Sequence, residues 1–166
     1  MLAPLVAPPN FGMVTDGVYR SGLPEDRHTP FLDALRLRSV VVLCPEGPPS
    51  DLAAWAADRG VQIVAPNSVL SGKGTALREV AALEVVAILR DPRRHPLLVT
   101  CAAGRYRTGV AVGCLRKTQR WTLSAILDEY RRFAGGKAQL ENEEFVELFD
   151  VSQVPPLDLD DPAAKV

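Results

Sequence analysis

Cysteine, histidine and long apolar runs are all scarce in this sequence, and each shortage excludes a class of protein. Three cysteines among 166 residues are an odd and sparse set, which excludes a disulfide framework and fits a reducing compartment, so we expect a cytoplasmic location. No apolar run approaches the ~20 residues that cross a bilayer, so we expect no membrane partner. No group of His, Cys, Asp and Glu has the spacing of metal ligands, so we expect neither a metal nor another cofactor.

Charge of either sign is not in excess, which limits the partners further. Lys and Arg number 19 and Asp and Glu number 20, giving a net charge of −1, which argues against general binding to nucleic acid. Residues 1–9 have no basic region and are broken by prolines, so they do not resemble a signal peptide. A hydrophobic content of 47% and a charged content of 23% are typical of a globular protein with one sizeable core.

The hydrophobic pattern predicts strands that alternate with helices. Such alternation indicates an α/β fold with a central, mainly parallel sheet flanked by helices. We expect one domain over residues 10–150, between an irregular arm at 1–9 and a disordered tail at 151–166. Strands are expected at 17–21, 39–44, 61–65 and up to Cys101, helices at 29–37, 50–60, 75–90, 108–119, 122–133 and 140–149, and a flexible segment at 66–74.

Residues 97–109 carry the strongest chemical signal. A short apolar run ends at Cys101, Arg107 follows, and a helical pattern begins at once. Backbone N–H groups that curl toward one point at a helix N-terminus bind oxyanions, and the same field favours a thiolate over a thiol. The planar guanidinium of Arg107 can bind two phosphoryl oxygens together. The pattern predicts a cysteine-dependent phosphatase loop in which Cys101 forms a phosphocysteine that water then hydrolyses.

The remaining loop residues agree with this interpretation. Gly104 permits a positive φ in a tight loop, and Thr108 offers a hydroxyl near the sulfur. A similar spacing joins Cys114 to Arg120, but no strand precedes Cys114 and no glycine follows it, so Cys114 is interpreted as a buried apolar residue. The loop amides that would contact the substrate belong to Ala102, Ala103, Gly104, Arg105 and Tyr106.

A general acid is the part of the site that the sequence does not supply clearly. Protonation of a serine or tyrosine leaving oxygen needs an acid, yet residues 61–90 contain no aspartate, and Glu79 is the only acidic residue near the flexible segment. Phosphate leaving from a phosphoanhydride is far less basic and needs less help. The sequence therefore favours a phosphoanhydride or another highly phosphorylated small molecule. A phosphotyrosine or dual-specificity protein phosphatase with Glu79 as the acid is the alternative, and Glu79 also fits a solvated residue of a first helical turn.

Several basic residues outside the loop could add positive charge to the site. Lys73 lies in the flexible segment and could fold over an anionic ligand, and Lys137 follows a Gly–Gly turn. Arg131 and Arg132 could act on the same side, with a solvated helix face as the alternative. Both histidines lie in turn-like surroundings and are expected at the surface.

The chain resembles the atypical dual-specificity phosphatases of plants and fungi, which act as inositol pyrophosphate phosphatases. The resemblance implies their cysteine-phosphatase fold, with Cys101 as nucleophile and Arg107 as phosphate ligand. It also implies that Arg105, Lys73 and Lys137 bind the phosphates of the substrate. The motifs that carry the resemblance, in chain order, are residues 10–14, 17–22, 37–46, 95–109, 112–117, 129–134, 137–138 and 145–150.

The chain also departs from the pattern of this family. Thr100 stands where a histidine usually precedes the cysteine, and Val80 aligns where an acidic residue usually stands. These departures keep a second alternative open, a weakly active or inactive module that binds phosphate. The others are Ala102 and Ala103 for a polar and a basic residue, Tyr106 for a histidine, Gln139 for an arginine and Asn142 for an aspartate.

Overall fold

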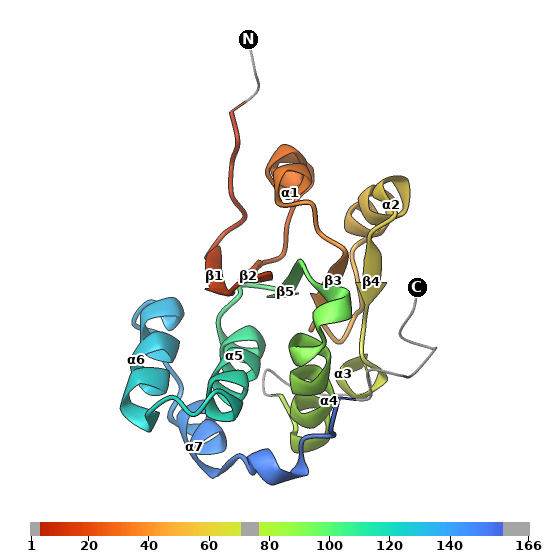
Figure 1. Ribbon diagram of the computed structural model, residues 1–166. Coiled ribbons are helices and arrows are strands. Elements are labelled where there is room, and N and C mark those ends of the chain that lie inside the picture. Colours follow the sequence, from red (N-terminus) through yellow and green to blue (C-terminus); the bar gives the residue numbers. More distant parts are fainter. Residues whose placement is uncertain (1–3, 71–76, 158–166) are drawn as a thin grey trace.

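Five strands form one sheet at the centre of the molecule (Figure 1). The computed structural model describes residues 4–70 and 77–157. The strand order is β1-β2-β5-β3-β4, with β1 antiparallel to β2 and the other pairs parallel. This confirms the predicted α/β fold with a mainly parallel sheet. The strands are β1 Gly12–Thr15, β2 Val18–Gly22, β3 Ser39–Val42, β4 Gln62–Val64 and β5 Leu97–Cys101.

Helices cover both faces of the sheet (Figure 1). On one face lie α1 and α2, and on the other lie α3 to α7, with α4, α6 and α7 packed against α5. The helices are α1 Thr29–Leu35, α2 Ser50–Arg59, α3 Asn67–Leu70, α4 Glu79–Arg90, α5 Tyr106–Thr118, α6 Leu123–Ala134 and α7 Leu140–Leu148. Short 3-10 turns lie at Asp26–His28, Pro92–Arg94 and Val151–Gln153.

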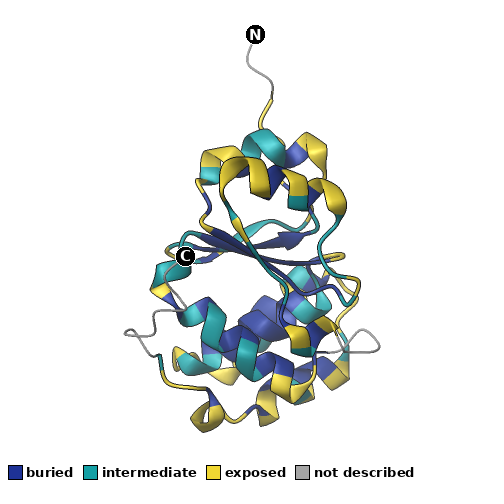
Figure 2. Ribbon diagram, turned by 90° about the vertical axis from the view of Figure 1, so that its right-hand side faces the viewer, coloured by how far each residue is buried: buried dark blue, intermediate teal, exposed yellow. Residues whose placement is uncertain are grey.

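The middle strand, β5, sets the position of the site. All five of its residues are buried, because an apolar strand with parallel neighbours is covered by helices on both faces. Its register places Cys101 opposite Gly22 of β2 and Thr100 opposite Val42 of β3. Helix α5 follows β5 after a loop of four residues and is itself mostly buried (Figure 2). Cys101 therefore lies at the carboxyl edge of a parallel sheet, where ligands bind in folds of this kind.

The first half of the chain differs from the sequence prediction in three places. Strand β1 was not predicted, because its short run gains its pairing only from β2. Residues 67–70 of the segment expected to be flexible form the short helix α3, and residues 71–74 of that segment lie outside the described residues. His28 is buried rather than exposed, because its Nδ1 accepts the backbone N–H of Glu25.

Element ends shift by one or two residues in several places, and two boundaries differ by more. Helix α4 begins at Glu79 rather than at residue 75, because Arg78 is extended and forms the N-cap. The folded chain also continues past residue 150, where the disordered tail was expected to begin. It does so because Val154 packs into the hydrophobic core after a 3-10 turn.

One buried ion pair ties the sheet to two helices, and its loss should cost much stability. Arg116 of α5 donates to both oxygens of Glu129 at 2.9 Å and to the Val14 carbonyl at 2.7 Å. The two side chains are 5% and 9% exposed. Since Arg116→Met would leave a buried carboxylate unpaired, we expect the free energy of unfolding to fall by about 3–5 kcal/mol, measured by urea denaturation.

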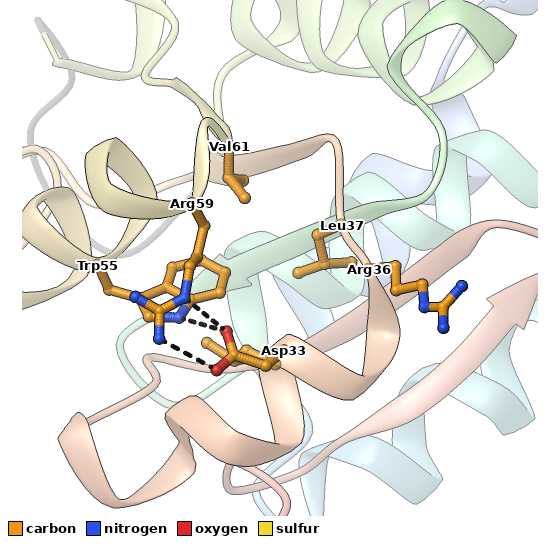
Figure 3. Close-up of a pocket in the computed structure, with 7 residues that line it drawn as sticks. Asp33, Arg36, Leu37, Trp55, Arg59 and Val61 are labelled. Atoms are coloured by element: carbon orange, nitrogen blue, oxygen red, sulfur yellow. Dashed lines mark hydrogen bonds and ion pairs between the residues drawn. The ribbon is translucent and has the colours of Figure 1, made fainter.

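The matched control for this prediction is an exposed ion pair on the opposite face of the sheet. Arg59 of α2 binds Asp33 of α1, and these side chains are 43% and 40% exposed (Figure 3). Arg59→Met should cost less than about 1 kcal/mol, because exposed pairs gain little. Equal losses for the two substitutions would contradict the assignment of the Arg116–Glu129 pair as a main support of the fold.

Candidate active site

The site is built where β5 gives way to α5. Cys101 is the last residue of β5 and is only 5% exposed. The loop that follows, residues 102–105, turns at once, since the N–H of Gly104 donates to the Cys101 carbonyl at 3.1 Å. Ala102 and Ala103 are exposed and Arg105 is half-buried. The loop thus leads from a buried sulfur to the N-terminus of a buried helix, which is the arrangement that the sequence predicted.

Gly104 makes the tight turn possible. Its φ is +67°, in the left-handed region that favours glycine. A Cβ at this position would lie 2.4 Å from the Gly22 nitrogen and 2.5 Å from the Ser21 carbonyl carbon. The loop therefore lies directly against the end of β2, and the Leu23 N–H donates to the Ala102 carbonyl at 3.3 Å.

Arg107 lies in the first turn of α5 and reaches across the carboxyl edge of the sheet. Its Nη1 donates to the Leu43 carbonyl at 3.4 Å, just beyond the end of β3. This places a half-buried guanidinium at the edge where Cys101 lies. Thr108 is fully buried, and its hydroxyl has no hydrogen-bond partner in the described part of the chain, as is also true of Thr100. Two buried hydroxyls that have no hydrogen-bond partner among the described residues therefore lie on either side of the loop.

The other two cysteines differ from Cys101 in their surroundings. Burial, with the nearby Cys101 and Glu46, raises the pKa of the Cys44 thiol to about 11, although the Ala102 backbone and Arg107 oppose this rise. Burial raises the pKa of Cys114 to about 12, in the middle of α5. Both therefore stay as neutral thiols near pH 7, and the spacing from Cys114 to Arg120 corresponds to no loop.

The structure does not join the predicted site residues outside the loop to the loop by a hydrogen bond or ion pair between described residues. Lys73 lies outside the described residues. Glu79 is the first residue of α4 and is exposed. Lys137 is exposed beyond the end of α6. For the residues that the structure describes, no hydrogen bond or ion pair joins Glu79 or Lys137 to residues 102–107.

The arginine pair on α6 separates into two different environments. Arg131 binds Glu143 through two hydrogen bonds of 2.8 Å and 2.6 Å, and this bond raises the pKa of Arg131 and lowers that of Glu143. The guanidinium of Arg132 instead lies 5.7 Å from the ring centre of Phe133, at the end of α6 nearest the loop. Arg132 is therefore the better candidate of the two for added positive charge.

Two residues that contact the loop were not singled out from the sequence. Arg20 of β2 donates from Nη2 to the Gly104 carbonyl at 3.0 Å. Asn10 donates to the same carbonyl at 3.0 Å and to the Phe133 carbonyl at 2.9 Å. One signal was available, because Arg20 is the charged residue of the short strand β2, just before the carboxyl edge of the sheet.

A separate hollow of about 280 Å³ lies between α1 and α2 (Figure 3), on the face of the sheet opposite α5. Asp33 fills part of it and is bound there by Arg59 and by the indole N–H of Trp55. Within residues 4–70 and 77–157, no cluster of three or more His, Cys, Asp or Glu could hold a metal ion. None of the described helices combines the length and apolarity that a membrane crossing requires.

Comparison with known proteins shows that this chain is similar to a family of phosphatases. The model of the tyrosine phosphatase family matches residues 5–164. OCA1 of Mycosarcoma maydis, which carries the name of a tyrosine-protein phosphatase, is 45% identical over 148 residues, covering 88% of this chain and 94% of its own. Inositol diphosphatase DSP4 of Arabidopsis thaliana is 41% identical over 150 residues, covering 90% of this chain and 76% of its own.

A solved structure supports the same assignment. The core catalytic domain of the PP-IP phosphatase SIW14 from S. cerevisiae, in complex with citrate, superimposes with a TM-score of 0.85. The two sequences are 32% identical, and the match covers 91% of each chain. The chain therefore belongs to the tyrosine phosphatase family, in its atypical dual-specificity branch, and is a phosphatase of the cysteine-dependent class.

Proposed function

We propose that this phosphatase hydrolyses a phosphoanhydride bond in a highly phosphorylated small molecule of the inositol pyrophosphate type. The observation that carries the proposal is the loop itself, which joins Cys101 at the end of β5 to Arg107 in the first turn of α5. The names of the plant relatives and of the yeast structure point to this class of substrate. The three reduced cysteines suit a cytoplasmic location, where a thiolate nucleophile stays reduced.

In the mechanism that we propose, Cys101 is the nucleophile. Its thiolate attacks the terminal phosphorus, an S–P bond forms, and the P–O bond to the leaving phosphate breaks with its electron pair. Water then attacks the phosphocysteine, loses a proton, and displaces the thiolate, which restores the enzyme. Arg107 and the N–H groups of residues 102–106 stabilise the equatorial oxygens in both steps.

We propose roles for six further residues in this site. The buried hydroxyl of Thr108, unpartnered in the described chain, would donate to the sulfur as it leaves phosphorus. Arg105 and Tyr106 are half-buried at the start of α5 and contribute loop amides. Lys73, Lys137 and Arg132 are the cations that would bind the remaining phosphates of the substrate.

The lack of a clear general acid beside the loop, among the residues that the structure describes, favours this substrate over a protein phosphoester. Glu84, deeper in α4, is held by the hydroxyl of Ser68, and Glu79 is exposed at the start of the same helix. A leaving phosphate is weakly basic, whereas a serine or tyrosine oxygen needs a proton. A protein phosphatase that uses Glu79 is the second candidate, since Glu79 is the acidic side chain at the helix start that borders the 71–76 segment.

Glu79→Gln tests these candidates by a change in rate. With an inositol pyrophosphate we expect kcat within roughly twofold of the unchanged protein, because the leaving group departs without a proton. Loss of a working general acid costs typically 10²–10⁴-fold. A loss of that size with a phosphotyrosine peptide, together with loss of the basic limb of the pH–rate profile, would favour the protein phosphatase. Glu84→Gln is the matched control, because it alters a carboxylate of the same helix that is already bound.

The direct experiment measures phosphate release from an inositol pyrophosphate and from a phosphotyrosine peptide, with Cys101→Ser as the blank. A clear preference for the pyrophosphate supports the proposal. A preference for the peptide would replace it with the protein phosphatase. If the protein releases phosphate from neither substrate but still binds inorganic phosphate, it is an anion-binding module. Thr100 and the loss of basic loop residues suggest this alternative.

A further inference from the structure

Arg20 is the largest of the fully buried side chains, and its position is unusual for a cation. It is 1% exposed, and its guanidinium lies 3.8 Å from the ring centre of Phe133. One nitrogen, Nη2, donates to the Gly104 carbonyl. The other two, Nε and Nη1, have no hydrogen-bond partner within the described chain. A guanidinium that is buried but only partly hydrogen-bonded costs free energy, so an anion nearby is needed to offset it.

The carboxylate whose charge acts on Arg20 does not fill that role. Both oxygens of Glu129 are bound by Arg116, at 2.9 Å each. Glu129 acts on Arg20 only as a more distant charge, and burial lowers the pKa of Arg20 to about 10, so it remains a cation near pH 7. Behind the loop, two buried guanidiniums thus share one buried carboxylate. The charged groups that act on Arg20 are Glu129 and Cys101, which stabilise its charge, and Arg116 and Arg132, which oppose it.

Geometry directs the surplus positive charge toward the nucleophile. Arg20 precedes Gly22 by two residues, and Gly22 pairs with Cys101 across β2 and β5. Its Nη2 also lies 3.8 Å from the Cβ position of Gly109, in α5. The guanidinium is therefore enclosed between the loop, the first turns of α5 and the end of α6. The side of the loop that it contacts is the side away from the substrate amides, since it binds a carbonyl.

We propose that Arg20 is a positioning residue for the phosphate loop that acts in two ways. It holds the Gly104 carbonyl, which keeps the neighbouring N–H groups turned toward the anion, and its buried charge balances the thiolate of Cys101 from behind the loop. The inference deepens the proposed function and rests on it only for the identity of the nucleophile. Asn10 shares the first role, because it binds the same carbonyl, but it carries no charge.

Three substitutions separate charge from hydrogen bonding. Arg20→Gln removes the charge and keeps an amide donor, Arg20→Lys keeps the charge without the planar fork, and Asn10→Gly removes only a donor. Glycine is chosen at position 10 because φ there is +57°. The readout is the rate at which iodoacetamide alkylates Cys101 at pH 7, followed by peptide mass spectrometry, which distinguishes Cys101 from the slow Cys44 and Cys114. Only the thiolate reacts.

We expect Arg20→Gln to slow the alkylation of Cys101 by roughly tenfold or more, since tenfold corresponds to 1.36 kcal/mol of lost charge stabilisation. Arg20→Lys and Asn10→Gly should stay within about threefold of the unchanged protein in this assay. Asn10→Gly should instead raise KM for p-nitrophenyl phosphate with little change in alkylation, because it loosens the loop and leaves the charge in place.

Alkylation of Arg20→Gln at the unchanged rate, in a variant with the native circular dichroism spectrum, would overturn the proposal. So would an equal slowing in Asn10→Gly. If Arg20→Gln does not fold, Arg20→Lys still decides, because a tenfold slowing with the charge retained contradicts the electrostatic role. Alkylation needs no substrate, so failure to hydrolyse an inositol pyrophosphate would reject the proposed function without touching this result.

Discussion

Cys101→Ser is expected to abolish phosphate release while leaving the binding of the phosphate anion intact. The serine hydroxyl is not ionised at neutral pH, so the attacking species is lost and turnover should fall by at least about 10³-fold. Anion binding rests on Arg107 and on the loop amides, which the substitution does not alter. Single-turnover phosphate release measures the first effect, and calorimetric titration with inorganic phosphate measures the second.

The control for this variant is Cys114→Ala, which also removes one buried thiol from the same chain. Cys114 lies in the interior of α5, so its loss should lower stability slightly and leave turnover within about twofold, as expected for a small cavity far from the reacting atoms. If Cys101→Ser turned over substrate at a rate comparable to that of Cys114→Ala, the covalent mechanism would be wrong.

Gly104→Ala should have the second largest effect, on stability and activity together. At φ +67° an alanine is strained, and its Cβ would lie within 2.7 Å of three backbone atoms of Ser21 and Gly22, which cannot rotate away. We expect the free energy of unfolding to fall by about 2–4 kcal/mol, as for a substitution that adds collision to backbone strain. The loop must shift to relieve the contact, so kcat should fall by roughly 100-fold through misplaced donors.

Gly135→Ala separates strain from collision. Gly135 has nearly the same φ, +61°, but a Cβ there would meet nothing within 4 Å. This variant should cost only about 1–2 kcal/mol, the penalty of the left-handed conformation itself, and should retain its activity. Urea denaturation and kcat measured side by side give the comparison. Equal losses in both variants would show that the close approach of the loop to β2 contributes nothing.

The sequence was sufficient to predict those parts of the molecule that depend on neighbouring residues. The run that ends at Cys101, the glycine in the loop and the helix after it are local signals, and together they predict a site at the carboxyl edge of the sheet. The mainly parallel sheet followed from the alternation of strands and helices. Strand β1 was not predicted because its extended form depends on pairing with β2. A run of four residues carries no signal of such pairing.

The residues that escaped prediction act over long separations in the chain. Arg20 resembles a polar residue of an edge strand until β5 and α6 enclose it, and Asn10 stands just before β1, at the start of the predicted domain. Neither has a periodic pattern to identify it. The pairing of Arg131 with Glu143 likewise depends on how α6 and α7 pack, so the sequence could not show which arginine of the pair is already bound. The roles of Lys73, Lys137 and Glu79 remain predictions.

The contacts that hold the Gly104 carbonyl have a consequence for how the chain acquires its reactivity. They join residues separated by 84 and 94 positions, and contacts of such high sequence separation form late in folding because their loop-closure entropy must be overcome first. A chain that has completed β5 and α5 but has not yet docked β2 holds every residue of the loop without its support. Chemical competence should therefore require that β2 has docked, so the appearance of a fast-reacting thiol can report that these long-range contacts have formed.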